Sequence, residues 1–315
     1  MNIEYRFGFV GLGSIARRHI RNLKAVTAER GDTCKVDVYR SGKGAAIPKE
    51  LERLIDHVYY DADGIPEEYD VVFVTNPTSL HMNAIRKFQK HAKAFFIEKP
   101  VFHSSSVSLE KLELGDKICY VACPLRYTGA IRYLKEHLDP QDVLSMRVVS
   151  ASYLPDWRPG TDYRKTYSAQ KALGGGVSID LIHEWDYITY LIGMPKQVTS
   201  IIRTVSDLEL DSDDIAVYLA DYGSCIAELH LDYFTRIPIR KVEITTNELY
   251  MEADLIRQTI RRSDMEEDIS FENERDAFQK KELEFFLDVL EGKRQNTNDI
   301  RHAIDVLKIA EGKTL

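Results

Sequence analysis

A glycine-rich turn near the start of the chain restricts its possible folds more than any other feature. Gly11, Gly13 and Ala16 form a G-x-G-x-x-A pattern that directly follows an apolar run and directly precedes a stretch with apolar residues at helical spacing. The first glycine permits a tight turn, the second lets a pyrophosphate approach the backbone, and the small third residue lets the helix pack close to a sheet. Free N–H groups at the helix start, around Ser14 and Ile15, attract phosphate. The pattern therefore predicts dinucleotide binding.

Short apolar runs continue to alternate with helix-like stretches through the first part of the chain. The expected strands are 6–10, 35–39, 71–74, 94–97 and 118–122, and the first expected helix is 17–28. Such alternation is typical of a parallel sheet covered on both faces. We therefore expect an α/β protein. Its residues 1–123 form a doubly wound Rossmann domain, and residues 124–315 form a substrate-binding and oligomerisation domain whose last helices are able to pack back on the first.

Composition and charge exclude several classes of protein. The chain has 315 residues and a net charge of −8, which argues against a nucleic-acid or anionic-membrane partner. Its four cysteines form no CxxC pair, and no apolar stretch approaches the ~20 residues that span a bilayer. The segment around His183 lacks the second histidine of an HExxH zinc site. We expect a cytoplasmic protein without a metal that acts on a small molecule.

The end of the second expected strand bears on the choice of cofactor. An acidic residue usually binds the adenosine ribose hydroxyls there, but this chain has Arg40 and Ser41, and Asp37 lies about two residues earlier, inside the strand. A guanidinium beside a hydroxyl suits a 2′-phosphate. We therefore expect NADP(H) to be favoured over NAD(H). The alternative is that Arg40 stacks on adenine in either cofactor.

Two further segments leave the carboxyl edge of the expected sheet, where open parallel sheets bind ligands. Asn76 and Pro77 follow the third strand and are candidate contacts to the ribose or nicotinamide, as is His81, which begins the next helix. A histidine bonded to the backbone at the helix start is the alternative for His81. Glu98 and Lys99 follow the next strand and precede Pro100, which disfavours a helical conformation for Lys99. Both are candidate cofactor contacts.

The second domain shows alternating apolar and polar residues. The runs 215–222, 225–233 and 240–246 are expected to be successive strands of an antiparallel meander, and helices are expected at 276–291 and 299–311. The exposed face of such a sheet needs a cover. We expect face-to-face pairing of sheets into a homodimer or homotetramer.

Together these motifs resemble those of the glucose–fructose oxidoreductase/inositol dehydrogenase (Gfo/Idh/MocA) family. The segments that carry the resemblance are 11–16, 75–77 with His81, 98–100, and 174–186. The resemblance implies a Rossmann domain followed by an α/β domain with a large open, mainly antiparallel sheet. It also implies NAD(P)-dependent hydride transfer at a hydroxyl-bearing carbon, usually of a sugar or polyol. In that pattern Lys99 binds the reacting oxygen, His183 is the acid/base, and Asp180 lies beside them.

The spacing of Asp180 and His183 departs from many relatives, in which the aspartate precedes the histidine by four residues rather than three. On one helix both spacings place the side chains on the same face. The ordinary pKa of a histidine side chain is close to neutrality, so His183 is the natural general base, and Lys99 is able to donate hydrogen bonds to an alkoxide or share the proton transfer. Glu184 and Asp186 are alternative partners of His183. Packing of His183 against neighbouring aromatic residues is the structural alternative.

A segment between the domains supplies candidate substrate contacts. Aromatic faces stack on sugar rings, and guanidiniums pair with carboxylates or phosphates. We name Trp157, Arg158 and Arg164 from this segment, and Arg126 and Tyr127 from just past the fifth strand. The arginines suggest an anionic or nucleotide-linked sugar, and interdomain packing is the alternative for Trp157.

Two other functions are compatible with the same fold. An NAD-dependent glycosidase uses the hydride transiently and cleaves glycosides without net cofactor turnover. A non-catalytic, cofactor-binding regulatory protein keeps the glycine turn but loses the catalytic residues, and the presence of Lys99, Asp180 and His183 argues against it.

Overall fold

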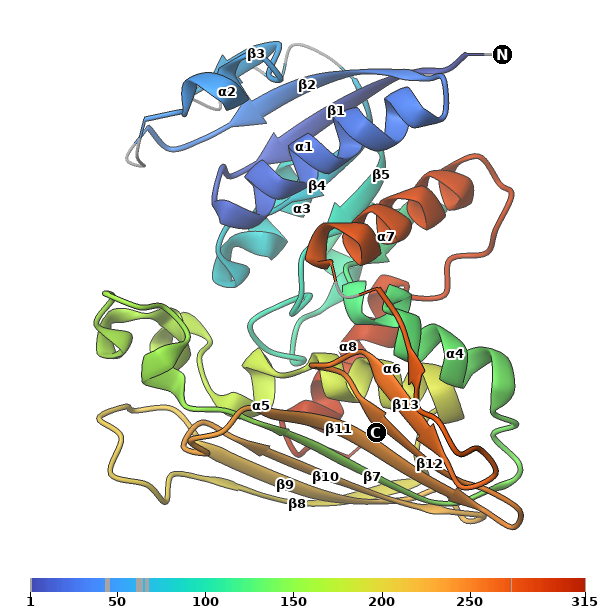
Figure 1. Ribbon diagram of the computed structural model, residues 1–315. Coiled ribbons are helices and arrows are strands. Elements are labelled where there is room, and N and C mark those ends of the chain that lie inside the picture. Colours follow the sequence, from blue (N-terminus) through green and yellow to red (C-terminus); the bar gives the residue numbers. More distant parts are fainter. Residues whose placement is uncertain (1, 43–45, 61–64, 66–67, 273, 315) are drawn as a thin grey trace. The chain divides into compact units, whose positions relative to one another are not determined.

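The computed structural model describes residues 2–42, 46–60, 65, 68–272 and 274–314, which form two compact units. The first unit comprises residues 1–102, 106–122 and 279–303, and the second comprises residues 103–105, 123–278 and 304–315. Each unit has its own sheet with helices packed on it (Figure 1). Among the described residues, no helix has the length and apolar character needed to cross a bilayer.

The first unit is built on a six-stranded parallel sheet in the order β3-β2-β1-β4-β5-β6. The strands are β1 (Glu4–Val10), β2 (Thr33–Tyr39), β3 (His57–Tyr59), β4 (Tyr69–Val74), β5 (Ala92–Ile97) and β6 (Ile118–Val121). Its helices are α1 (Ser14–Glu29), α2 (Lys49–Glu52), α3 (His81–Phe88) and most of α7 (Arg275–Leu290). The strand order reverses at β1 and β4, and such a switch point is where doubly wound sheets bind ligands. The strand β3 was not expected.

An aromatic core holds the helix α7 on this sheet. Phe73 of β4 stacks on Phe96 of β5 at 4.8 Å between centroids, and Phe286 of α7 meets both rings edge-on. Fully buried aromatic side chains of this size contribute about 1.5–3 kcal/mol each to stability. Arg30 at the end of α1 also pairs with Asp288 of α7 at 3.0 Å.

The second unit is built on an eight-stranded sheet in the order β14-β13-β12-β11-β7-β10-β9-β8. The strands are β7 (Val143–Ala151), β8 (Gln197–Arg203), β9 (Ile215–Asp221), β10 (Ile226–Asp232), β11 (Ile239–Thr246), β12 (Tyr250–Asp254), β13 (Thr259–Arg262) and β14 (Ile269–Ser270). The expectation of a simple meander is wrong, because β7 inserts between β10 and β11 and runs parallel to β10. A strand from earlier in the chain thus separates two strands that are consecutive in sequence. All other pairs in the sheet are antiparallel.

Helices lie on one face of the second sheet (Figure 1). They are α4 (Gly129–His137), α5 (Val177–Asp180), α6 (His183–Ile192) and, from residue 304, α8 (Ile300–Ala310). Tyr218 of β9 donates a hydrogen bond to the carbonyl of Ala310 at 2.7 Å, which fastens α8 to the sheet. No helix of the described residues lies on the opposite face in Figure 1.

Candidate active site

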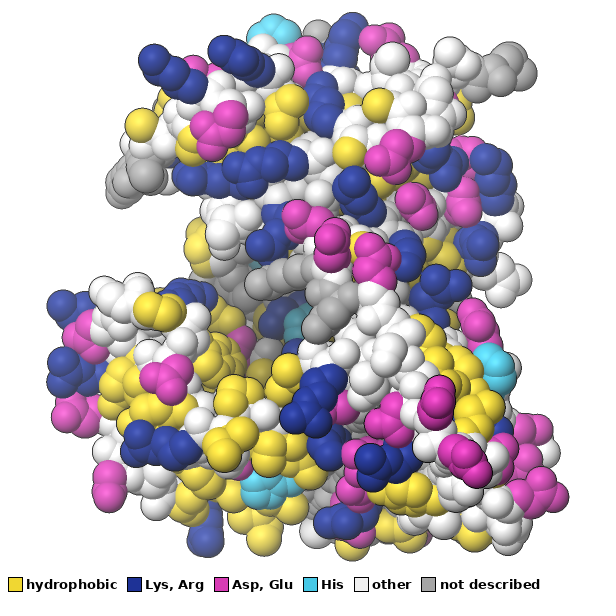
Figure 2. All heavy atoms as spheres, viewed as in Figure 1, with side chains coloured by type: hydrophobic (Ala, Val, Ile, Leu, Met, Phe, Trp, Pro, Cys, Tyr) yellow, Lys and Arg dark blue, Asp and Glu magenta, His cyan; other side chains and the backbone are white. Residues whose placement is uncertain are grey.

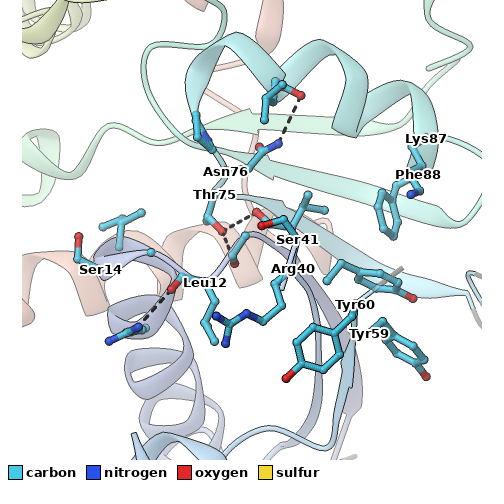
Figure 3. Close-up of a pocket in the computed structure, with 18 residues that line it drawn as sticks. Leu12, Ser14, Arg40, Ser41, Tyr59, Tyr60, Thr75, Asn76, Lys87 and Phe88 are labelled. Atoms are coloured by element: carbon cyan, nitrogen blue, oxygen red, sulfur yellow. Dashed lines mark hydrogen bonds between the residues drawn. The ribbon is translucent and has the colours of Figure 1, made fainter. Parts of the chain in front are cut away.

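A cleft of about 780 Å³ opens at the carboxyl edge of the first sheet. The sequence-predicted residues that line it are Gly11, Gly13, Ser14, Ile15, Arg40, Ser41, Asn76 and Pro77. Figure 3 shows Ser14 at one end of the cleft and Tyr59, Tyr60 and Phe88 at the other, with Arg40 between them. The cleft therefore joins the glycine turn, the end of β2 and the loop after β4.

The two glycines of the turn have different physical reasons to be there. Gly11 has φ +92°, and a Cβ at this position would lie 2.9 Å from the Cα of Asn76. Gly13 has φ −73°, which any residue adopts, and a Cβ there would meet no protein atom within 4 Å. Protein packing thus explains Gly11, whereas the space above Gly13 is open to a ligand.

The start of α1 provides unused hydrogen-bond donors beside this space. Gly13 is the N-cap residue of α1, no side chain caps the helix, and its first turn has no acidic residue. The first N–H groups of a helix lack intrahelical partners and attract anions. An open, uncapped helix start above a glycine fits the pyrophosphate of a dinucleotide.

The charges around the cleft are positive. Arg17, Arg40 and Lys87 line it, and no aspartate or glutamate is among its described lining residues. In Figure 2 Lys and Arg side chains also lie over α1. Arg40 lies 5.9 Å from the ring centroid of Tyr60, and its backbone N–H donates to the carbonyl of Tyr59 at 2.9 Å.

The carboxylate of Asp37, the acidic residue of β2, is bound by protein groups on several sides. Its carboxylate is fully buried and accepts a hydrogen bond from the Tyr69 hydroxyl at 2.8 Å. Arg6 and His57 also contact it, each at 3.2 Å. With these partners Asp37 is part of the structural core of the sheet.

The structure places His81 differently from a direct cofactor contact. The ring is buried, its Nδ1 lies 3.0 Å from the carbonyl oxygen of Val101, and its Nε2 lies 3.0 Å from that of Asn76. Burial lowers the pKa of His81, and the hydrogen bonds to the carbonyls of Val101 and Asn76 act in the opposite direction. This arrangement is the backbone-bonded alternative, and His81 does not line the cleft.

The segment after β5 contains the lysine. The Glu98 carboxylate contacts His19 of α1, with Oε1 and Nε2 2.6 Å apart, and the Glu98 N–H donates to the carbonyl of Val74 at 3.0 Å. Lys99 follows, partly buried, and the Lys99–Pro100 peptide bond is cis. His19 was not among the predicted site residues, although a polar residue on the apolar stripe of α1 is itself a signal for a buried contact.

In the second unit, three hydroxyl groups surround Asp180, the last residue of α5. Its carboxylate accepts hydrogen bonds from Ser168 Oγ at 2.7 Å, from the Tyr233 hydroxyl at 3.1 Å, and from the Tyr167 hydroxyl. Gly175 makes this arrangement possible, since a Cβ there would lie 2.0 Å from the carbonyl oxygen of Tyr167. Burial and the nearby Asp180 raise the pKa of Tyr167, so its hydroxyl remains a donor.

The expectation that one helix carries both Asp180 and His183 is wrong. Helix α5 ends at Asp180 and α6 begins at His183, with two residues between them outside both helices. Of the alternative partners named for His183, Glu184 is fully buried and accepts from Arg240 at 2.6 Å. Asp186 accepts from Arg126 at 2.7 and 2.9 Å. Glu184 and Asp186 are thus held by guanidinium groups, whereas Asp180 accepts hydrogen bonds from hydroxyl groups.

The candidate substrate residues fall into two groups. Arg126 is buried in its pair with Asp186, and Arg164 pairs with Asp162 and Glu209, each at 2.8 Å, so both have structural partners. Trp157 donates to Ser152 at 2.8 Å and packs edge-on against Tyr233, and Tyr127 is partly buried. Arg158 is exposed and lies 5.8 Å from the ring centroid of Tyr167, with no carboxylate among the described residues at salt-bridge distance.

Comparison with known proteins agrees with this architecture. Residues 5–114 match the model of the oxidoreductase family with an NAD-binding Rossmann fold, and residues 131–248 match the Gfo/Idh/MocA C-terminal domain. The chain belongs to the Gfo/Idh/MocA family. The family match identifies the first of these segments as an NAD-binding Rossmann domain.

One curated relative is scyllo-inositol 2-dehydrogenase (NAD(+)) of Bacillus subtilis, which is 26% identical to this chain over 209 residues. The alignment covers 64% of this chain and 57% of that enzyme, so the chain spans little more than half of the relative's length. Among solved structures, UDP-N-acetylglucosamine 3-dehydrogenase of Acidithiobacillus ferrooxidans is 20% identical with a TM-score of 0.77, and covers 98% of this chain and 96% of its own. A levoglucosan dehydrogenase in its apo form is 16% identical with a TM-score of 0.83, and covers 99% of this chain and 96% of its own. These structures share the fold of the Gfo/Idh/MocA member described here.

Proposed function

We propose that this protein is an NAD(P)-dependent oxidoreductase that transfers a hydride between the nicotinamide and a hydroxyl-bearing carbon of a sugar, polyol or sugar derivative. The observation that carries the proposal is the cleft at the carboxyl edge of the first sheet, with its open space above Gly13 and its uncapped helix. The family and its curated inositol and xylose dehydrogenases support the same chemistry. The bound nicotinamide supplies the hydride acceptor or donor.

Three residues carry the rest of the reaction in this proposal. When an alcohol is oxidised, the carbon loses a hydride and the hydroxyl loses a proton, and the C–O single bond becomes a double bond. His183 takes the proton as general base, and Lys99 donates a hydrogen bond to the oxygen while negative charge develops on it. Asp180, which accepts hydrogen bonds from Ser168 and Tyr233, orients the substrate or the histidine in this proposal.

The test is a turnover assay on a panel of neutral sugars, polyols, sugar acids and nucleotide sugars, followed by the absorbance of the reduced nicotinamide with each cofactor. Cofactor reduction with at least one of these alcohols is expected. Tight cofactor binding without turnover on the whole panel would contradict the proposal. Glycoside cleavage without net reduction would instead identify a glycosidase.

The proposal includes a preference for NADP(H). Arg40 and Ser41 lie just past the end of β2, and the charged side chains that line the cleft are basic. The carboxylate of Asp37 accepts a hydrogen bond from Tyr69. An Arg40→Ala substitution is expected to weaken NADPH binding by about 10- to 100-fold, because charge-assisted hydrogen bonds to a phosphate contribute about 1.5–3 kcal/mol. NADH binding should change less than threefold. Fluorescence titration with both cofactors measures this difference.

Arg21→Ala is the matched control, because Arg21 is also on this unit but pairs with Glu50 and does not line the cleft. It should leave both affinities unchanged. Equal weakening of NADPH and NADH by Arg40→Ala would show that Arg40 stacks on adenine, and the NADP(H) preference would be rejected.

We also propose Arg158 as a contact to the substrate, which favours a sugar with an anionic group. Its guanidinium lies over Tyr167, the residue that donates to Asp180, and it has no carboxylate partner among the described residues. Arg164, on the same segment, is paired on two sides. The exposed guanidinium of Arg158, close to the proposed active-site carboxylate, is able to bind a carboxylate or phosphate group of the substrate.

We further propose that the bare face of the second sheet forms a homodimer or homotetramer in the cytoplasm. Ile201, Val217, Leu219 and Ile226 are 60, 37, 52 and 42% exposed, and Ile201 pairs with Val217 across β8 and β9. Figure 2 shows hydrophobic side chains over these strands at the lower edge of the molecule. A solvated sheet face normally alternates to polar residues, so apolar side chains at these outward positions indicate a buried interface.

The prediction for this surface is a mass at least twice that of the chain in light scattering. The double substitution Ile201→Asp and Leu219→Asp should give a monomer, because it places charges in the interface. Glu228→Lys lies on the same face, opposite Leu219, and should weaken the assembly less than the double substitution, because it exchanges one charge for another. A monomeric wild-type protein would contradict the proposed assembly.

A further inference from the structure

Two buried histidines hold the segment that contains Lys99. His19 of α1 contacts the side chain of Glu98, immediately before the lysine, at 2.6 Å. His81 of α3 contacts the carbonyl of Val101, two residues after the lysine, at 3.0 Å. Both rings are 1% exposed, and all of these residues belong to the first unit.

Each histidine also belongs to an element that lines the cofactor cleft. His19 lies on the helix that begins at Gly13 and the open donors, and the Nε2 of His81 lies 3.0 Å from the carbonyl of Asn76, which lines the cleft. The two sides of the cleft are thus each joined to the lysine segment by one imidazole ring.

Packing alone does not explain a histidine at position 19. The ring lies in an aromatic environment, 5.1 Å from the Phe96 centroid and 5.9 Å from that of Phe73, where an apolar side chain would pack without cost. Nδ1 is buried and has no hydrogen-bond partner among the described residues. A buried polar atom without a partner destabilises the fold, so the contact of Nε2 with Glu98 is the feature that favours histidine here.

We propose that His19 and His81 are positioning residues that fix the segment 98–101 and so set the place of Lys99 relative to the cofactor cleft. The inference rests on the proposed function for its effect on rate, but its structural content concerns the first unit alone. Through His19 the Glu98 carboxylate is bound to α1, and through His81 the backbone after the lysine is bound to α3. A catalytic group displaced by about 1 Å loses on the order of 100-fold in rate.

The experiment uses the full chain with His19→Leu, His81→Leu, and the conservative His19→Gln, whose amide nitrogen is able to replace Nε2. Two quantities are measured: hydrogen–deuterium exchange of peptides covering 97–102, with and without NADPH, and kcat and KM. Both leucine variants should speed exchange in 97–102 and lower kcat by about 10- to 100-fold, while the KM for cofactor stays within about threefold. His19→Gln should restore slow exchange and most of kcat.

His57→Leu is the matched control. His57 also contacts a buried carboxylate, that of Asp37 at 3.2 Å, but it lies on β3, which three strands separate from β5. His57→Leu should change neither the hydrogen–deuterium exchange in 97–102 nor kcat and KM. Glu98→Ala removes the His19 contact from the partly exposed side and should reproduce the exchange of His19→Leu, which keeps the inference testable if a leucine variant fails to fold.

Wild-type exchange in 97–102 for both Glu98→Ala and His81→Leu would overturn the inference, whatever the activity. An equal rise in exchange throughout the first unit would also overturn it, because it would indicate general destabilisation. If the wild-type protein turns over no alcohol, the proposed function fails, and the exchange measurements still decide the positioning role.

Discussion

Replacement of Lys99 by alanine is expected to lower kcat by about 1,000-fold, with the affinity for the cofactor changed by less than about threefold. In the proposed reaction the ammonium donates to an oxygen that gains negative charge, and removing one such donor costs 100- to 1,000-fold in rate. In this proposal the pyrophosphate is bound by the backbone N–H groups at the start of α1, above Gly13, and not by the lysine. The measurement is kcat under saturating substrate, beside a fluorescence titration of the reduced cofactor.

Lys93→Ala is the matched control for this prediction. Lys93 lies on β5, the strand that precedes Lys99, but it is exposed and pairs with Asp70 at 2.8 Å. It should retain wild-type kcat. Lys99→Arg should recover little activity, because the larger, planar guanidinium does not place a donor where the compact ammonium does. A Lys99→Ala variant with normal kcat but weak cofactor binding would remove Lys99 from the chemistry and leave it a cofactor contact.

Local patterns in the sequence predicted much of the first unit. The strand–turn–helix at Gly11–Ala16 appears as β1 and α1, because a glycine turn between a buried strand and an amphipathic helix leaves few other conformations. Expected strand ends at Val10, Tyr39, Val74 and Ile97 coincide with the observed ones. Because parallel strands end at the same edge of the sheet, the loops that follow them lie together there. The position of the cleft could therefore be predicted from the strand ends.

What the sequence could not predict depends on pairing between distant segments. β7 lies between β10 and β11 because of a parallel pairing across about eighty positions of the chain, which local alternation does not encode. β3 has only three residues, too few for a periodic signal, yet it brings Tyr59 and Tyr60 into the cleft. The contact of His19 with Glu98 also joins segments far apart in sequence.

The break between α5 and α6 is another feature that the sequence did not predict. The expectation placed Asp180 and His183 on one helix, but the carboxylate of Asp180 accepts hydrogen bonds from the hydroxyls of residues 167, 168 and 233. Tertiary hydrogen bonds to a buried carboxylate outweigh the small local preference for helix continuation. The types of residue in the sequence indicated the candidate chemistry. The hydrogen-bond partners of each residue could not be predicted from the sequence.

Gly13→Asp is expected to abolish cofactor binding while leaving the protein at least as stable as the wild type. Gly13 has φ −73°, and a side chain there would enter open space. Aspartate is a preferred N-cap residue and would accept hydrogen bonds from the first N–H groups of α1, a gain of a few tenths of a kcal/mol over glycine. The same carboxylate would occupy the donors that bind the pyrophosphate and repel its charge, so affinity for both cofactors should fall more than 100-fold.

Gly11→Ala should give the opposite result, which makes the pair of variants decisive. At φ +92°, with a Cβ 2.9 Å from the Cα of Asn76, alanine strains the turn and should lower the free energy of unfolding by about 1–3 kcal/mol. Urea unfolding measures stability, and fluorescence titration with NADPH and NADH measures affinity. If Gly13→Asp retained cofactor affinity, the pyrophosphate would not lie above Gly13, and the cleft would have lost the physical basis for its assignment. If it lost stability as Gly11→Ala does, the space above Gly13 would be a packing requirement of the fold and not a binding site.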